Sequence, residues 1–146
     1  MNKRIITLQG KSDTGKTETL KILIDKLSKI YPVTIFKKIH DKKSEDLVVE
    51  VELKDKKLGI TTRGDSRYYL ERDFRKLGDC DLYVCASRTK GATIDFLDEQ
   101  TNSGILITHG KWYFFDKKSA LSVKSLRDSF NEKQADEIFD EIMAII

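Results

Sequence analysis

Residues 10–17 constrain the fold of this chain more than any other stretch. They read Gly-Lys-Ser-Asp-Thr-Gly-Lys-Thr, after the β-prone run 4–9 and before residues 18–27, whose apolar positions have helical spacing. The glycines at positions 10 and 15 allow a sharp turn and a close approach of the backbone. The amino terminus of the following helix directs unpaired N–H groups and the positive end of its dipole at an anion. Strand, glycine loop and helix therefore predict a loop built around an anion.

The stretch also matches a known pattern at four fixed positions, which are Gly10, Gly15, Lys16 and Thr17. The G-x-x-x-x-G-K-T sequence is the phosphate-binding P-loop, or Walker A, motif. Over residues 4–27 the chain therefore resembles the P-loop nucleoside-triphosphatase and kinase superfamily. The resemblance implies that Lys16 reaches the β- and γ-phosphates, that Thr17 ligates Mg²⁺ and that backbone amides cradle the phosphates. The expected residues for Mg²⁺ with ATP are Gly10, Lys11, Ser12, Asp13, Thr14, Gly15, Lys16, Thr17 and Glu18.

Composition indicates one soluble domain spanning residues 1–146. The chain is 39% hydrophobic and 35% charged, and no apolar run approaches the ~20 residues that a membrane span needs. The first residues lack the pattern of a signal peptide, so we expect a cytoplasmic protein without a membrane partner. The two cysteines, Cys80 and Cys85, have neither disulfide nor zinc-site spacing, and we expect reduced thiols.

Positive charge is concentrated near the start of the chain. Residues 1–40 carry nine Lys or Arg against three Asp or Glu, although the whole chain has a net charge of only +3. This asymmetry fits the binding of a nucleoside triphosphate. No basic run is dense enough to indicate nucleic acid, and a homo-oligomeric assembly stays open.

The order of predicted elements favours an α/β protein. We expect strands at 4–9, 33–39, 47–53, 58–62, 82–86 and 104–109, and helices at 16–30, 67–77, 93–100 and 121–146. The first strand, helix and second strand read as a βαβ unit with a parallel pair and a right-handed crossover. Residues 47–53 and 58–62 read as an antiparallel hairpin around a turn at 54–57, and 111–115 as a further strand or half-hairpin. The predicted fold class is a three-layer P-loop NTPase fold, with a mostly parallel sheet and an antiparallel hairpin addition.

Motifs that the sequence lacks indicate which nucleotide the protein binds. Neither the D-x-x-G switch nor the guanine-reading N-K-x-D occurs, which favours ATP over GTP. The apolar strand 82–86 is followed by Ser87 in place of an acidic residue, which disfavours a nucleic-acid motor. Asp65, directly after strand 58–62, is the best candidate for the carboxylate that holds the metal. A helix cap is the equal alternative for Asp65.

Other polar residues follow predicted strands and could serve a transfer reaction. Asp41, beside His40, could position or deprotonate the hydroxyl of a small-molecule or nucleotide acceptor, or it is a solvated loop residue. Arg63 and Arg88 come at strand carboxyl ends, where ligands bind in open α/β sheets. Because Arg presents a fork of donors to phosphate oxygens, we favour these two over the other arginines for stabilising transferred charge. Lys16, Asp65, Asp41, Arg63 and Arg88 are thus the candidate catalytic residues.

Two further stretches, 59–65 and 85–91, resemble those of small P-loop ATP-binding proteins of bacteria and their phages. The resemblance implies an ATP-binding fold and names no substrate. We therefore expect a Mg²⁺-dependent protein that hydrolyses ATP or transfers its γ-phosphate. The alternative is a nucleotide-responsive binding module with negligible turnover, whose loops 63–66 and 87–93 reorder when ATP binds.

Overall fold

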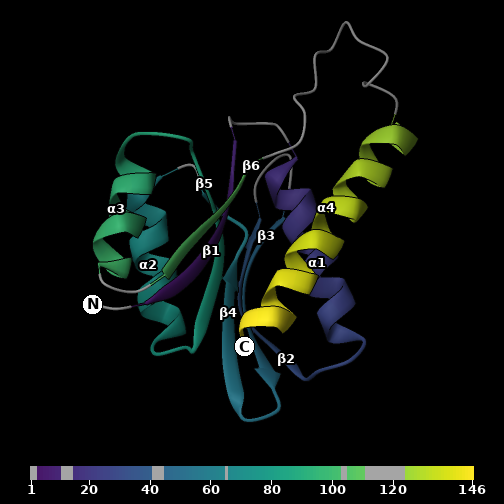
Figure 1. The fold of residues 1–146 in the computed structure, drawn as a ribbon, viewed down its shortest axis with the longest axis horizontal. Coiled ribbons are helices and arrows are strands. Elements are labelled where there is room, and N and C mark those ends of the chain that lie inside the picture. Colours follow the sequence, from purple (N-terminus) through teal and green to yellow (C-terminus); the bar gives the residue numbers. More distant parts are fainter. Residues whose placement is uncertain (1–2, 11–14, 41–44, 65, 103–104, 111–123) are drawn as a thin grey trace, which may run out of the picture.

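The computed structural model describes residues 3–10, 15–40, 45–64, 66–102, 105–110 and 124–146. It is an α/β fold in which helices cover both faces of a mixed sheet (Figure 1). The strands are β1 (Arg4–Gln9), β2 (Val33–His40), β3 (Glu45–Leu53), β4 (Lys56–Thr61), β5 (Leu82–Ser87) and β6 (Ile105–Gly110). The helices are α1 (Lys16–Ser28), α2 (Arg67–Leu77), α3 (Ala92–Thr101) and α4 (Lys124–Ile145). The predicted segment 111–115 lies outside the described residues.

The described strands form a six-stranded sheet in the order β2-β3-β4-β5-β1-β6. β4, β5, β1 and β6 are parallel neighbours, whereas β3 is antiparallel to both β2 and β4. The hairpin of β3 and β4 is therefore confirmed, as is the mostly parallel character of the sheet. Because β3 runs in the opposite direction, it begins at the edge of the sheet where β4 and the strands parallel to β4 end.

Period-two alternation along the strands divides the core into two clusters, one on each face. On one face α1 and α4 cover the sheet, and on the other α2 and α3 do so (Figure 1). The first cluster includes Ile6, Leu8, Leu23, Val49, Ile60, Val84, Ile138 and Ile142. The second includes Ile5, Leu70, Phe74, Tyr83, Cys85, Phe96 and Leu97. The tail helix α4 thus packs on the core through apolar residues such as Ile138 and Ile142.

Two local expectations are wrong. β2 does not pair with β1 but lies at the far edge of the sheet, where it pairs with β3. Only residues 41–44 separate β2 from β3, and such a short connection makes antiparallel neighbours and cannot make a crossover. The turn predicted at 54–57 is also shorter, because Leu53 already pairs with Lys56 and Lys54 adopts a left-handed φ of 58°.

Candidate functional site

The candidate site lies at the edge where the parallel strands reach their carboxyl ends. There the Gly10 N–H donates to the Ser87 carbonyl oxygen at 3.1 Å, which joins the exits of β1 and β5. The hydroxyls of Thr7 and Ser87, both fully buried, lie 2.8 Å apart. Ligands of open α/β sheets bind outside this edge. The backbone that leads into residues 10–17 is therefore fixed against the neighbouring strand.

Gly15 turns the chain from the loop into α1. Its φ of 89° lies in the left-handed region, which a residue with a Cβ adopts only at a cost. Its carbonyl oxygen accepts the first α1 hydrogen bond, from the Thr19 N–H at 3.0 Å. The sharp turn that the sequence predicts at Gly15 is thus present. Residues 11–14 lie outside the described residues, so the cradle of amides expected of Lys11, Ser12, Asp13 and Thr14 stays a prediction.

Lys16, the first residue of α1, reaches back toward the sheet. It is only 6% exposed, and its Nζ donates to the carbonyl oxygens of Gly10 at 2.7 Å and Ser87 at 3.2 Å. A buried ammonium needs such hydrogen bonds because it has lost water. The helix dipole adds positive potential at the same end of α1. Both charges favour an anion at this edge of the sheet.

A trio of oxygen-bearing side chains lies beside Lys16, formed by Thr17, Asp46 and Thr62. The Thr62 hydroxyl donates to Asp46 Oδ1 at 2.8 Å and accepts the Leu47 N–H at 3.0 Å. The Thr17 hydroxyl is 3.4 Å from Asp46 Oδ1 and 3.3 Å from the Thr62 carbonyl oxygen. Since O–H···O bonds are usually about 2.7–2.8 Å, the Thr17 hydroxyl is held weakly. It can exchange these partners for another ligand at small cost.

Sequence reasoning missed Asp46. An acidic residue that starts a strand is normally placed far from the ligand-binding edge of a parallel sheet. Here β3 runs in the reverse direction, so its first residues reach the edge where β4 ends, and Val48 pairs with Thr61. The hairpin predicted for 47–53 and 58–62 contained the signal, because it requires the start of one strand to face the end of the other.

Two predicted carboxylates, Asp65 and Asp41, lie outside the described residues. The metal role of Asp65 and the acceptor role of Asp41 therefore stay predictions. His40 ends β2, whose backbone pairs there with Glu45.

Arg63 is engaged in a buried ion pair. Its guanidinium donates to Asp73 of α2, from Nη2 to Oδ1 at 2.8 Å and from Nε to Oδ2 at 3.3 Å. Thr61 also donates to Asp73 Oδ2, at 2.7 Å, and the guanidinium lies 4.1 Å from the centroid of the Tyr69 ring. In this arrangement Arg63 fastens α2 to the end of β4. Any part in phosphoryl transfer would require it to leave Asp73, and that part stays a prediction.

The remaining predicted residues, Arg88 and Glu18, are exposed at the same edge. The Arg88 N–H, directly after β5, donates to the Thr93 hydroxyl at 3.1 Å and so joins the β5 exit to α3. Glu18 lies in the first turn of α1. The structure therefore brings Gly10, Lys16, Thr17, Ser87 and Arg88 to one edge, from β1, α1 and β5.

The donor chemistry at this edge fits Mg²⁺ with a polyphosphate. Mg²⁺ prefers oxygen ligands and is commonly bound through one or two carboxylates together with substrate phosphates and water. Asp46 and Thr17 supply a carboxylate and a hydroxyl, and Lys16 supplies positive charge. Across the described ranges, no group of three or more His, Cys, Asp or Glu side chains gathers to hold a metal ion.

Comparison of the chain with protein-family models, curated proteins and solved structures found no significant match. Within the part of the chain that the structure describes, no helix has the length and apolar character needed to cross a membrane.

Proposed function

We propose that this protein binds Mg²⁺-ATP at the edge formed by the exits of β1 and β5 and the start of α1. The observation that carries the proposal is the burial of Lys16 at that edge, with its Nζ between the carbonyl oxygens of Gly10 and Ser87. The left-handed backbone conformation of Gly15 and the G-x-x-x-x-G-K-T pattern of residues 10–17 support the proposal. The absence of D-x-x-G and N-K-x-D from the sequence favours adenine over guanine nucleotides.

Each residue has a defined part in this proposal. Lys16 contacts the terminal phosphates, and the amides of residues 10–17 hold the phosphate oxygens. The Thr17 hydroxyl and the Asp46 carboxylate hold the metal. Mg²⁺, when bound, supplies positive charge to the β- and γ-phosphate oxygens. Thr62 positions Asp46 through the bond between its hydroxyl and Oδ1.

We infer that the reaction is ATP hydrolysis or transfer of the γ-phosphate to a small-molecule or nucleotide acceptor. Phosphoryl transfer is catalysed mainly by positioning and charge stabilisation, so a cation near the leaving and transferred groups contributes most. Arg88 is our candidate for this cation, because it follows β5 directly and is exposed. Asp65 and Asp41 stay candidates for the metal side and the acceptor side.

One observation favours the second candidate, a nucleotide-responsive module with negligible turnover. Arg63, the other predicted cation, is bonded through two nitrogens to buried Asp73. A cation held in this way stabilises the fold rather than transferred charge. Loops 63–66 and 87–93 would then transmit nucleotide binding to a partner.

Turnover of radiolabelled ATP discriminates these functions. The assay is run with Mg²⁺ alone and with a panel of nucleosides and nucleotides. Release of free phosphate identifies an ATPase, and label on an acceptor identifies a kinase. Binding of Mg²⁺-ATP without either product identifies the module, and absence of binding contradicts the whole proposal.

A further inference from the structure

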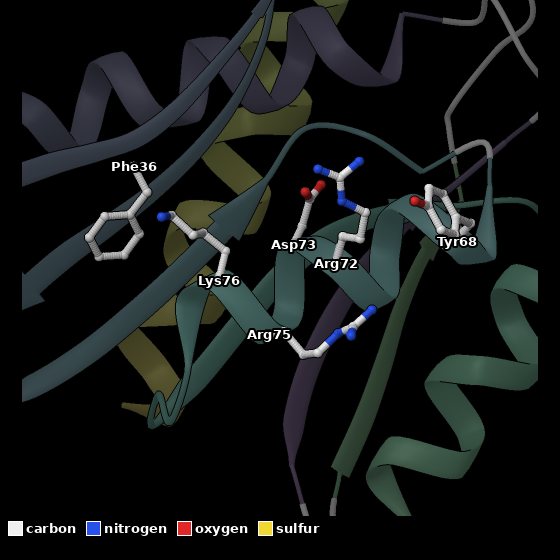
Figure 2. Close-up of a pocket in the computed structure, with 6 residues that line it drawn as sticks. All are labelled: Phe36, Tyr68, Arg72, Asp73, Arg75 and Lys76. Atoms are coloured by element: carbon white, nitrogen blue, oxygen red, sulfur yellow. The ribbon is translucent and has the colours of Figure 1, made fainter.

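The exposed side of α2 carries a row of cations beside a pocket. Tyr68, Arg72, Arg75 and Lys76 have the spacing i, i+4, i+7 and i+8, which places them along one side of a helix. Together with Phe36 of β2 and Asp73, they line a pocket of about 880 Å³ (Figure 2). This lies near the top of the ~300–1,000 Å³ range of ligand sites. We call these six residues the α2 groove.

The cations of the α2 groove differ from the other arginines near α2. Arg63 is bonded to Asp73, and Arg67 is bonded to Glu71 at 2.8 Å and Glu99 at 2.5 Å. By contrast, Arg72, Arg75 and Lys76 are exposed, and no ion pair within the described ranges involves them. The one carboxylate that lines the groove, Asp73, is already paired with Arg63. The groove therefore presents positive charge that its own side chains do not neutralise.

Aromatic side chains lie at both ends of this row. Tyr68 is 60% exposed at the start of α2, and the Arg72 guanidinium lies 5.6 Å from its ring centroid. Phe36 lies at the opposite end of the groove, on the edge strand β2 (Figure 2). Tyr68 is exposed, whereas Phe36 is partly buried and packs against the second core cluster, so only part of its ring is open to the groove. Aromatic rings beside cations that form no ion pair with other described residues suit a ligand that has both flat apolar faces and negative charges.

We propose that the α2 groove binds single-stranded nucleic acid. Bases stack on Tyr68 and Phe36, and phosphates pair with Arg72, Arg75 and Lys76. Cationic grooves with aromatic stacking platforms are the general solution for binding single strands without sequence preference. An acidic peptide would satisfy the cations but has no flat rings for Tyr68 and Phe36. The groove is separate from Lys16 and Thr17, so this inference does not rest on the proposed ATP site.

The test measures fluorescence anisotropy of a labelled oligothymidylate about 12 nucleotides long, within the ~4–16-nucleotide sites usual for such proteins. Binding is followed over a range of salt concentrations. Neutralising the three cations together, in R72Q/R75Q/K76Q, should reduce the slope of log K against log salt by about 2, since each phosphate contact on a single strand contributes ~0.7. Equal slopes for this variant and the wild type would overturn the proposal.

A matched control separates the groove from general electrostatics. The variant K21Q/K29Q/K133Q removes the same charge from α1, its C-cap residue Lys29 and α4, on the other face of the sheet. It should leave the salt slope and the affinity close to the wild-type values. An equal loss in this control would mean that net charge, rather than the groove, holds the oligonucleotide.

Stacking is tested with a second pair of variants. Tyr68→Ala should weaken binding about fivefold or more, whereas Tyr68→Phe, which keeps the ring, should bind like the wild type. Because Tyr68 is exposed, both variants should melt like the wild type. Equal binding by Tyr68→Ala would contradict stacking on this ring.

Competitors and the P-loop variant complete the test. Lys16→Ala should keep oligonucleotide binding, so failure of the ATP proposal and failure of this one can be told apart. Duplex DNA binding as tightly as the single strand would overturn the assignment. Competition by polyglutamate equal to that by unlabelled oligonucleotide would do the same, in favour of an acidic protein partner. Absence of binding at low salt would also overturn it.

Discussion

At the scale of single residues, Asp73 has an unusual environment. It is 1% exposed, and its two oxygens accept hydrogen bonds from the Arg63 guanidinium and the Thr61 hydroxyl. A buried carboxylate is tolerated only when it is paired and hydrogen-bonded in this way. Because Thr61 and Arg63 flank Thr62, which bonds to Asp46, the pair fixes backbone that adjoins the candidate metal ligands.

Removal of Asp73 should therefore be costly. Asp73→Ala leaves the charge of Arg63, whose side chain is only 12% exposed, without its partner, and we expect the free energy of unfolding to fall by about 3–5 kcal/mol. Urea denaturation measures the change. Glu99→Ala, which removes an exposed partner of Arg67, is the control and should unfold close to the wild type. Similar losses in both variants would contradict the structural role of the buried pair.

The two cysteines provide a prediction on pH. Burial raises the pKa of the Cys85 thiol to about 12 and that of Cys80 to about 11, from an ordinary value of 9.0. The folded protein thus keeps protons that the unfolded chain releases. Stability from this difference is fully present below pH 9.0 and is lost as pH rises through the folded pKa values. The unfolding free energy should fall less over this range in Cys85→Ala than in the wild type.

Thiol alkylation gives an independent readout of the same burial. Both cysteines are free thiols, and the thiolate is the form that reacts. At neutral pH iodoacetamide should modify the native protein slowly, and Cys80, which is half-buried, should react before Cys85. Rapid modification of Cys85 in the native protein would contradict the burial of this thiol in the core.

The metal ligand is the third question at this scale. If Asp46 holds Mg²⁺ with Thr17, Asp46→Asn should remove most of the Mg²⁺ dependence of ATP binding, measured by calorimetry with and without the metal. Asp65→Asn is the paired variant, because the sequence favours that residue for the same role. If the Mg²⁺ dependence of ATP binding is lost in Asp65→Asn but kept in Asp46→Asn, the metal ligand is Asp65 and not Asp46.

At the scale of elements, the segment after β4 is packed tightly against β5. A Cβ added at Gly64 would clash with the Ala86 carbonyl oxygen, carbonyl carbon and Cβ. This contact brings the residues after β4 against the end of β5, beside Ser87 of the candidate site. Backbone cannot move aside as a flexible side chain does, so only glycine fits here.

Gly64→Ala should accordingly lower the free energy of unfolding by about 1–3 kcal/mol, the usual cost of forcing extra volume into packed structure. Gly110→Ala is a matched control, because a Cβ there meets no atom of the described residues within 4 Å and Gly110 has no left-handed φ. Chemical denaturation of both variants makes the comparison. Equal stability would mean that the segment after β4 does not pack on Ala86.

At the scale of the whole molecule, local pattern predicts most elements but not their neighbours. The helix at 67–77 and the hairpin before it can be predicted from the spacing of their apolar residues. Helical spacing marks the buried face of a helix, and alternation marks the buried face of a strand. The place of β2 depends instead on the brief connection 41–44, and pairing with β3 outweighs the βαβ reading.

The candidate site, like the fold, could be predicted only in part. Gly15 and Lys16 are recognisable because the loop chemistry is written in consecutive residues. Asp46 is not, since it reaches the site only through the reversal of β3. The α2 groove is hidden for the same kind of reason, because its cations are spread along a helix and form no basic run.

The most direct test is the melting temperature of the protein with and without Mg²⁺-ATP. A ligand that binds only the folded state stabilises it by about 2.7 kcal/mol at 100 times its Kd, so the wild type should melt at a clearly higher temperature when the nucleotide is present. Lys29→Ala, at the exposed end of α1, should keep that shift. Lys16→Ala should lose it, each variant being compared with its own nucleotide-free melting temperature. A full shift in Lys16→Ala would contradict nucleotide binding at residues 10–17.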